Sequence, residues 1–306
     1  MLDARQLEAF AAVVEHGGFG AAAKVLSLTL AAVSLRIKAL EGQLGQRLLV
    51  RGKVVRATAA GQALLAHVKQ VRMMEADVLS GLQGGGVATG GQRAAWQTLA
   101  VAVNADSLTG WFLPGVAPLL QGHSLLLDIL IEDQDHTHDA LKSGEVMGCV
   151  TTLAEPMRGC VAEPLGVMRY RCLAAPEVVQ RCRTPTGVIS PHRMLAQPAI
   201  IFNRKDALQD VFLAQHFGLR QPNYPRHFAP AVDAFEAALV LGMGWGMVPE
   251  LHVPQLPTLQ ELVPGAWVDV VLYWQHWARE SPSAQRLTQA VKTAAQASLA
   301  HRVSSV

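Results

Sequence analysis

The apolar positions in the first 45 residues recur at the spacing of three short helices. The first helix ends at Gly17-Gly18, and a tight turn at residues 27–29 separates the second helix from the third. Thr29 is placed to cap the third helix, which ends at Gly45. Two helices joined by so tight a turn are typical of a helix-turn-helix, which places its second helix in a groove of DNA. The apolar faces consist of Leu7, Phe10, Ala11 and Val14, then Phe19, Ala22, Ala23 and Leu26, then Val33, Ile37, Leu40 and Leu44.

Two short β-branched runs within residues 48–61 flank Arg51-Gly52-Lys53 and predict a small hairpin, the wing of a winged helix-turn-helix. Thr58 then caps a long helix that reaches about Gln83. The helix carries a heptad-like apolar seam, interrupted by Glu75, that consists of Leu64, Val68, Val71, Val78 and Leu82. Because a single helix of this length has no domain to pack on, we expect the seam to meet a second copy of itself. The alternative is that the helix covers its own domain.

The glycine-rich residues 84–92 form the clearest linker and mark the main domain boundary. Beyond them strands alternate with helices, which predicts parallel sheets with right-handed crossovers in two lobes. Ligands usually lie in the cleft at the carboxyl ends of such strands. The expected strands are 99–103, 125–131, 147–152, 170–174, 199–202, 246–248 and 268–273, and the expected helices include 106–120, 140–141, 208–217, 232–241 and 281–299.

The N-terminal segment is basic, although the whole chain of 306 residues carries a net charge of only +2. Residues 1–90 hold 10 Lys and Arg against 6 Asp and Glu, whereas residues 91–306 hold 16 against 18. Such asymmetry indicates a polyanionic partner, an ordinary solvated basic surface being the alternative. Six of the basic residues share 21 positions with a single acid, Glu41, and these are Arg36, Lys38, Arg47, Arg51, Lys53 and Arg56.

The remaining composition indicates a cytoplasmic protein that forms oligomers. Charged residues make up only 16% of the chain, which is low for an exposed surface and favours an assembly that hides part of it. The four cysteines match no metal or redox spacing and are expected to be free thiols in a reducing cytoplasm. No apolar signal core and no run of 18 apolar residues is present, so we expect no membrane partner. The cysteines are Cys149, Cys160, Cys172 and Cys182.

The residues from Phe19 to Arg51, FGAAAKVLSLTLAAVSLRIKALEGQLGQRLLVR, and the TAAG that follows resemble the N-terminal part of LysR-type transcriptional regulators. The resemblance extends over nearly all 306 residues. Residues 99–120, 144–150 and 272–281 further resemble one subgroup, the arginine- and lysine-responsive regulators of basic amino-acid exporters.

This resemblance implies an α/β chain with an α-rich winged helix-turn-helix at its N-terminus and a two-lobed, periplasmic-binding-protein-like effector domain. Residues 1–61 would bind DNA, and residues 62–91 would form the dimerising linker helix and hinge. Residues 92–306 would bind the effector, with lobe I at about 92–162 and 268–306 and lobe II at about 163–267. The chain would cross between the lobes near residues 161–164 and 267–270. Homodimers or homotetramers, built as dimers of dimers, are expected.

Double-stranded DNA is the expected macromolecular partner. Lys38, Arg51 and Arg56 suit phosphate contacts, which set position, whereas residues early in the third helix suit contacts to base edges. The resemblance implies glutamine where this chain has Leu30 and Leu35, and a leucine can only touch a thymine methyl. Base readout is therefore expected to be altered, unless these leucines pack under the wing. The expected DNA-contacting residues are Thr29, Leu30, Ala31, Ser34, Arg36, Lys38, Arg51 and Arg56.

The expected effector is a small molecule, with lysine or arginine implied by the subgroup. Asn104 to Ser107 join a buried strand to a helix start, where free N–H groups favour a carboxylate. Asp106 either takes the ammonium group or only caps the helix. Asp133 and Asp233 are candidate partners for a cationic side chain. The expected effector-binding residues are Asn104, Asp106, Ser107, Asp133, Thr151, Asn203 and Asp233.

The sequence predicts neither a cofactor, nor a metal site, nor catalysis. His136-x-His138 has no third ligand nearby and is better explained as a solvated loop. Gly242-x-Gly244-x-Gly246 follows a helix and is expected to form a tight turn before a strand, not a phosphate loop. No nucleophile elbow, zinc-protease motif or P-loop is present. A ligand-controlled DNA-binding regulator is the favoured function, and a solute-binding receptor without a DNA function is the alternative.

Overall fold

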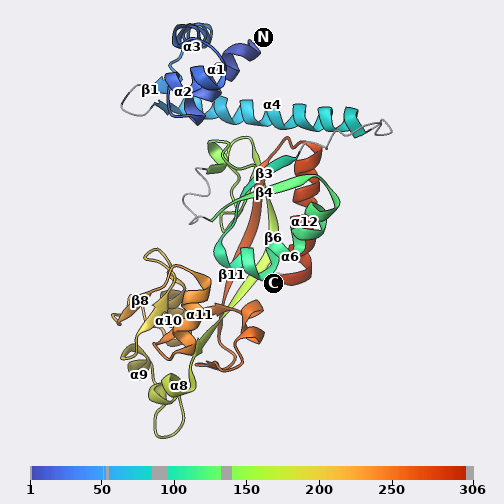
Figure 1. The fold of residues 1–306 in the computed structure, drawn as a ribbon. Helices are drawn as coiled ribbons and strands as arrows, with labels where there is room; N and C mark the ends of the chain where they lie inside the picture. The colour runs from blue at the N-terminus through green and yellow to red at the C-terminus, as the bar shows by residue number, and fades with distance from the viewer. Residues whose placement is uncertain (1, 51, 53–54, 85–95, 132–139, 301–306) are drawn as a thin grey trace.

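A computed structural model describes residues 2–50, 52, 55–84, 96–131 and 140–300. In Figure 1 a small helical unit at the N-terminus sits on one long helix, α4 (Ala59–Gly84), and an elongated α/β domain lies on the other side of that helix. The glycine-rich linker falls almost entirely on residues 85–95, outside the described residues.

The N-terminal unit is a three-helix bundle with a two-stranded wing. Its elements are α1 (Ala4–Glu15), α2 (Phe19–Val25), α3 (Leu30–Leu44), β1 (Leu49–Val50) and β2 (Arg56–Ala57). Thr29 caps α3, because its hydroxyl accepts a hydrogen bond from the Ala32 backbone N–H at 3.1 Å. Gly45 ends α3 in the left-handed conformation. The predicted helices, turn and hairpin are confirmed, and of the predicted face of α3 only Leu44 is exposed.

Within the described ranges, no single helix has the length and hydropathy to cross a membrane. Helices α2 and α3 meet those criteria only as a pair, and they are bent against each other by 107°. An angle of this size is typical of a helix-turn-helix.

Helix α4 packs on both parts of the molecule. Leu65 and Val68 are buried in the core of the N-terminal unit, and Arg72 pairs with Glu8 and Glu15 of α1 at 2.9 Å each. Met73 packs against the core of the α/β domain. The expectation that this helix has no domain to pack on is therefore wrong. Among the described seam residues only Val78 is exposed, together with its neighbour Leu79.

The α/β domain is built on one curled sheet of nine strands, in the order β4-β3-β5-β11-β6-β9-β7-β8 with β10 added to β6. The pairs β3–β4, β3–β5, β7–β8 and β7–β9 are parallel, as the βαβ pattern predicts. The long strands β6 and β11 are antiparallel to their neighbours, which the pattern did not predict. The strands are β3 (Gln97–Ala102), β4 (Leu125–Leu130), β5 (Gly148–Thr151), β6 (Cys160–Ala174), β7 (Ala199–Ile201), β8 (Arg226–Phe228), β9 (Trp245–Pro249), β10 (Gln260–Glu261) and β11 (Trp267–Trp277).

Helices divide this domain into two lobes at the two ends of the long strands (Figure 1). Trp245 and Trp274 are fully buried in its core and Trp277 nearly so. Five short elements escaped prediction: α8, α9, β8, η2 and β10. The helices are α5 (Ala105–Ser107), η1 (Leu108–Phe112), α6 (Leu113–Gly122) and α12 (Pro282–Ser298) toward one end, and α8 (Pro176–Cys182), α9 (Pro191–Leu195), α10 (Leu208–Phe217), α11 (Val232–Val240) and η2 (Glu250–Gln255) toward the other.

Strands β6 and β11 pair over the whole of β11 and most of β6, and they connect the two lobes. Their register shifts between Leu272, which pairs with Gly166, and Tyr273, which pairs with Pro164. Gly166 has φ +142°, a conformation that L side chains rarely adopt, so a glycine suits this bulge. The bulge is the one irregularity recorded in the pairing of β6 with β11, and it lies near the middle of both strands.

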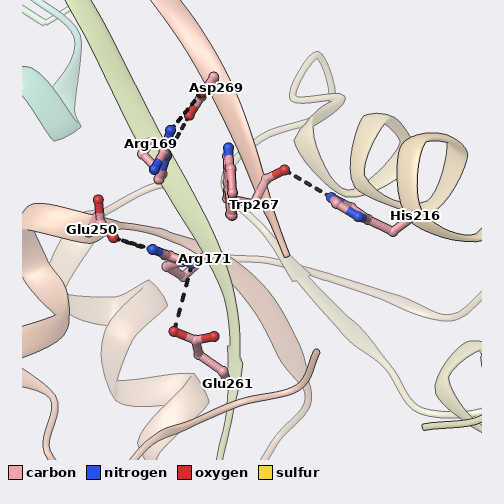
Figure 2. A network of polar contacts seen from close by, with 7 residues as sticks. All are labelled: Arg169, Arg171, His216, Glu250, Glu261, Trp267 and Asp269. Carbon is pink, nitrogen blue, oxygen red and sulfur yellow. Dashed lines mark hydrogen bonds and ion pairs between the residues drawn. The ribbon is translucent and has the colours of Figure 1, made fainter. Parts of the chain in front are cut away.

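Beyond the bulge a polar network ties the strands to lobe II (Figure 2). Arg169 and Asp269 are direct cross-strand partners, joined by two hydrogen bonds of 2.8 and 3.0 Å. Arg169 also lies over the ring of Trp267, with Arg171 nearby at 5.3 Å. Arg171 pairs with Glu250 of η2. These contacts stiffen the strands on one side of the bulge.

Helices α6 and α12 pack closely against each other. A Cβ added at Gly115 would overlap the Cβ of Ala294, so glycine is what lets the two helices approach. Gly122, on the same helix, has nothing within 4 Å of an added Cβ.

We therefore expect Gly115→Ala to destabilise the protein by about 1–3 kcal/mol, because the extra methyl forces α6 away from α12. Gly122→Ala is the matched control and should be neutral or stabilising by up to ~1 kcal/mol, since alanine favours a helix. Urea unfolding of the full chain measures both. A Gly115→Ala protein as stable as the control would contradict this packing.

Candidate functional site

The third helix presents a polar and basic surface that the rest of the protein leaves uncovered. Thr29, Ala31 and Lys38 are exposed, whereas Ser34 and Arg36 are half-buried. The single acid of the basic stretch, Glu41, points to the wing: its Oε1 accepts hydrogen bonds from Leu48 N at 2.8 Å and Leu49 N at 3.3 Å. The only carboxylate nearby in sequence thus holds the wing in place, and the basic surface keeps its positive potential.

The two leucines of this helix also face outward. Leu30 is 59% exposed and Leu35 is 69% exposed. The alternative that they pack under the wing is therefore wrong. Arg56 on β2 is exposed, and Arg51 lies outside the described residues. The α3 surface as a whole is free to meet a double helix.

A second candidate site is a hollow of about 340 Å³, partly open to solvent, between the two lobes. Its polar lining comes from four separate elements, so only the folded chain brings these groups together. Apolar side chains complete the wall of this hollow. The lining consists of Asp106, Phe202, Asp206, Leu208, Val232, Phe235, Glu236, Met247, Val248, Pro249 and His252.

Asp106 is a deeply buried carboxyl group of this cavity. Burial raises the pKa of Asp106, and the nearby carboxylates of Asp206 and Glu236 raise it further. A hydrogen bond of 2.8 Å from the Tyr170 hydroxyl and the proximity of His252 lower it in part. Burial and Asp106 in turn raise the pKa of Tyr170, which stays a neutral donor. A positive charge entering the cavity would stabilise the Asp106 carboxylate.

The other polar groups come from lobe II. Asp206 follows β7, and its two carboxylate oxygens accept hydrogen bonds from Phe202 N and Leu208 N. Glu236 on α11 accepts from His252 Nδ1 at 2.8 Å. The other ring nitrogen of His252 lies 3.4 Å from the Thr109 hydroxyl of η1, so this histidine bridges the lobes. Three carboxyl groups therefore converge on one small volume.

Two further polar atoms are buried close to Asp106. Asn104 Oδ1 and Ser107 Oγ have no hydrogen-bond partner among the described residues. Buried polar atoms without partners are rare in folded proteins, and they call for an explanation. Both flank the start of α5, where backbone N–H groups are free.

The structure brings only part of the predicted effector set to the cavity. Asp106 lines it, and Asn104 and Ser107 adjoin Asp106 in the chain. Asn203 turns its side-chain oxygen to the Lys205 and Asp206 backbone N–H groups, next to the lining residue Phe202.

Two other members of that set, Thr151 and Asp233, lie away from the cavity lining. Thr151 is buried, with its hydroxyl accepting from Leu153 N. Asp233 is exposed, and its carboxylate contacts the Ala234 N–H at the start of α11. Asp133 lies outside the described residues, as do His136 and His138. Within the described ranges, no group of three or more metal-ligating residues occurs.

Sequence reasoning missed Asp206, Glu236 and His252. A signal existed for the first two: Asp206 shares the loop after β7 with Asn203, and Glu236 shares a helix face with Val232. His252 had no such signal, because it lies in a short 3₁₀ turn that only the tertiary fold brings to the cavity.

Comparison with known proteins covers both candidate sites. Residues 4–62 match the family model described as bacterial regulatory helix-turn-helix protein, lysR family, and residues 96–296 match the LysR substrate binding domain. The HTH-type transcriptional regulator LysG of Mycobacterium tuberculosis is 41% identical over 303 residues, which is 96% of this chain and 94% of that protein.

Two solved structures are similar over nearly the whole chain. The crystal structure of ArgP from Mycobacterium tuberculosis has a TM-score of 0.87 and 38% identity, covering 99% of this chain and 100% of that one. Full-length LysG from Corynebacterium glutamicum with bound effector Arg has a TM-score of 0.82 and 31% identity, covering 97% and 99%. These matches support the DNA-binding interpretation over a receptor without a DNA function.

Proposed function

Since the chain belongs to the LysR family of DNA-binding transcriptional regulators, we propose that its effector is a basic amino acid, lysine or arginine, bound in the cavity between the lobes. Like its relatives, the protein is a transcriptional regulator and not an enzyme. In this proposal the bound amino acid changes the geometry in which paired helix-turn-helix units hold DNA. The resemblance of the chain to regulators of basic amino-acid exporters favours amino-acid export as the process that it controls.

The convergence of Asp106, Asp206 and Glu236 is the observation that carries this proposal. Like charges at close range in a partly desolvated site oppose one another, and a cation removes that cost. The guanidinium group of arginine or the ammonium group of lysine is such a cation. The structure of LysG with bound Arg is a second, independent support.

The polar groups divide naturally over the two ends of an amino acid. We assign the cationic side chain to the carboxylates of Asp206 and Glu236, and the α-ammonium group to Asp106. The α-carboxylate would take the free N–H groups at Asn104 to Ser107, together with the Ser107 hydroxyl. Asp133, Thr151, Asn203 and Asp233 remain candidates for contacts in a more closed arrangement of the lobes.

DNA is held by α3 and the wing in this proposal. Lys38, Arg51 and Arg56 contact phosphates with help from Arg36, and Thr29, Leu30, Ala31 and Ser34 face base edges. The exposed leucines favour thymine methyl groups where a glutamine would read adenine.

We further propose that the protein acts in the cytoplasm as a homodimer or homotetramer. The exposed Val78 and Leu79 of α4 support pairing through the linker helix. The proposed domains are residues 1–61 for DNA, 62–91 for the linker and hinge, and 92–306 for the effector, with lobe II at about 163–267.

Asp206→Asn and Glu236→Gln should each raise the Kd for arginine about tenfold or more, because each removes a charged hydrogen-bond acceptor. Affinity for wild-type protein should fall as the pH is lowered toward the raised pKa of Asp106, since a protonated carboxyl no longer attracts the ligand. Asp106→Asn should abolish this pH dependence. Isothermal calorimetry with arginine measures all three.

Asp128→Asn is the control for this set, since Asp128 is an exposed carboxylate on β4, away from the cavity. It should bind arginine as the wild type does. Unchanged binding in the two cavity variants would rule out the proposed site, and no binding of lysine or arginine by the wild type would rule out the effector.

Lys38→Ala should weaken DNA binding about equally for all sequences and lower the salt dependence of binding by roughly one counterion, as expected for a phosphate contact. Gel shifts on the upstream region of the gene, at several salt concentrations, measure both effects. Lys142→Ala, an exposed lysine of the effector domain, should leave the salt slope unchanged. A sequence-dependent loss would instead make Lys38 a base-reading residue.

A further inference from the structure

Helix α12 is attached at its first turn to the linker helix α4. Asp77 of α4 accepts a hydrogen bond from Ser283 N at 3.0 Å and another from the Ser283 hydroxyl. Ser281, the N-cap of α12, accepts from Ala284 N. A carboxylate at a helix N-terminus satisfies free N–H groups and interacts favourably with the helix dipole. The start of α12 is thus capped from outside, by another domain.

The surroundings of this contact show that it is built into the fold. Ser281 and Ser283 are 3% and 4% exposed. The Ser283 hydroxyl also lies 2.9 Å from Gln97 Oε1, at the beginning of β3. Burial raises the pKa of Asp77, but hydrogen bonds from Ser281 and Ser283 outweigh this and lower it. The carboxylate is therefore stabilised as an anion by groups of the effector domain.

The opposite end of α12 is attached to the bulge in β6. Ala300, just beyond the helix, exchanges two backbone hydrogen bonds with Val167, at 2.9 and 3.1 Å. A Cβ added at Gly166 would lie 2.9 Å from the Cβ of Leu299. Between the two ends, Lys292 pairs with Glu163 of β6. Seventeen residues of helix, about 25 Å at 1.5 Å per residue, therefore join the bulge to α4.

The linker helix is in turn fixed to the N-terminal unit of α1 to β2, which is the DNA-reading unit. Arg72 bonds Glu8 and Glu15 of α1, five residues before Asp77 on the same helix. Leu65 and Val68 are buried in the core of that unit. Any displacement of the α12 end of α4 must therefore move the helix-turn-helix as well.

We propose that Asp77 is the positioning residue through which the effector domain sets the orientation of its DNA-reading unit, with α12 as the rigid connector from the bulge of β6. The inference rests on the proposed function, because closure of the lobes on an effector is what would load the bulge. Asp77 touches neither DNA nor effector. It transmits the difference between two states, which is the requirement for coupling two sites.

The test uses the full chain with four variants: Asp77→Ala, Asp77→Asn, Ser283→Ala and Glu75→Ala. Glu75 is an exposed acid two residues away on the same helix and controls for loss of charge. Calorimetry gives the Kd for arginine, and gel shifts give the ratio of DNA affinities with and without arginine. Coupling between two sites typically makes this ratio about 5–150.

Asp77→Ala should keep its arginine affinity and bring the DNA-affinity ratio close to 1. Asp77→Asn should retain most of the response, because the amide oxygen still accepts from Ser283 N, and Ser283→Ala should be intermediate. Glu75→Ala should respond as the wild type does. A full response in Asp77→Ala, with arginine binding intact, would overturn the proposal.

A second measurement is independent of the effector. Solution X-ray scattering without ligand should give a larger radius of gyration for Asp77→Ala than for Glu75→Ala, because α4 is released from α12. Equal scattering curves would overturn the proposal. A wild type whose DNA binding ignores arginine would refute the proposed function instead, and the scattering comparison would still decide the role of Asp77.

Discussion

Three carboxyl groups share one small cavity at the junction of the lobes, and the fold has no lysine or arginine in its lining. Within the part of the chain that is described, the one basic side chain of that lining is His252, and it already contacts Glu236. Burial and repulsion from Asp206 and Glu236 make the Asp106 carboxylate costly there, as its raised pKa indicates. The cavity is thus electrostatically incomplete, and a cation is the complement it lacks.

The cavity lies where a small movement of the lobes would act on the two strands that connect them. Strands β6 and β11 run through both lobes, stiffened beyond their bulge by the cross-strand pair Arg169–Asp269 (Figure 2). Strand β6 meets the end of α12 at the bulge, and α12 reaches α4 at Asp77. In the proposed mechanism, a ligand that draws the lobes together would act on the bulge, and α12 and α4 would carry the displacement to the N-terminal unit, which sits on α4 (Figure 1).

Much of the fold could be predicted from local pattern alone. Thr29, Thr58 and Gly45 marked helix ends through capping chemistry that depends on neighbours a few residues away. Helix α10 begins and ends where its apolar spacing indicated. The antiparallel course of β6 and β11 could not be predicted in this way, because strand direction is set by partners about 100 residues apart.

The candidate sites divide along the same line. The proposed DNA-contacting residues lie within one short segment, α3 and the wing, so local spacing was enough to group them. The cavity is made by residues from α5 to η2, and only Asp106 of the predicted carboxylates lines it within the described ranges. Helix α4 was misjudged for a related reason. Its Met73 packs against the core of the effector domain and its Asp77 bonds Ser283, and these partners lie far away in sequence.

The most direct test of this account is a calorimetric comparison of arginine with citrulline, its neutral isostere, on the full-length protein at neutral pH. The account predicts that arginine binds and that citrulline binds at least about tenfold more weakly, because only the guanidinium carries the charge that the carboxylates lack. Equal affinities for the two ligands would contradict it.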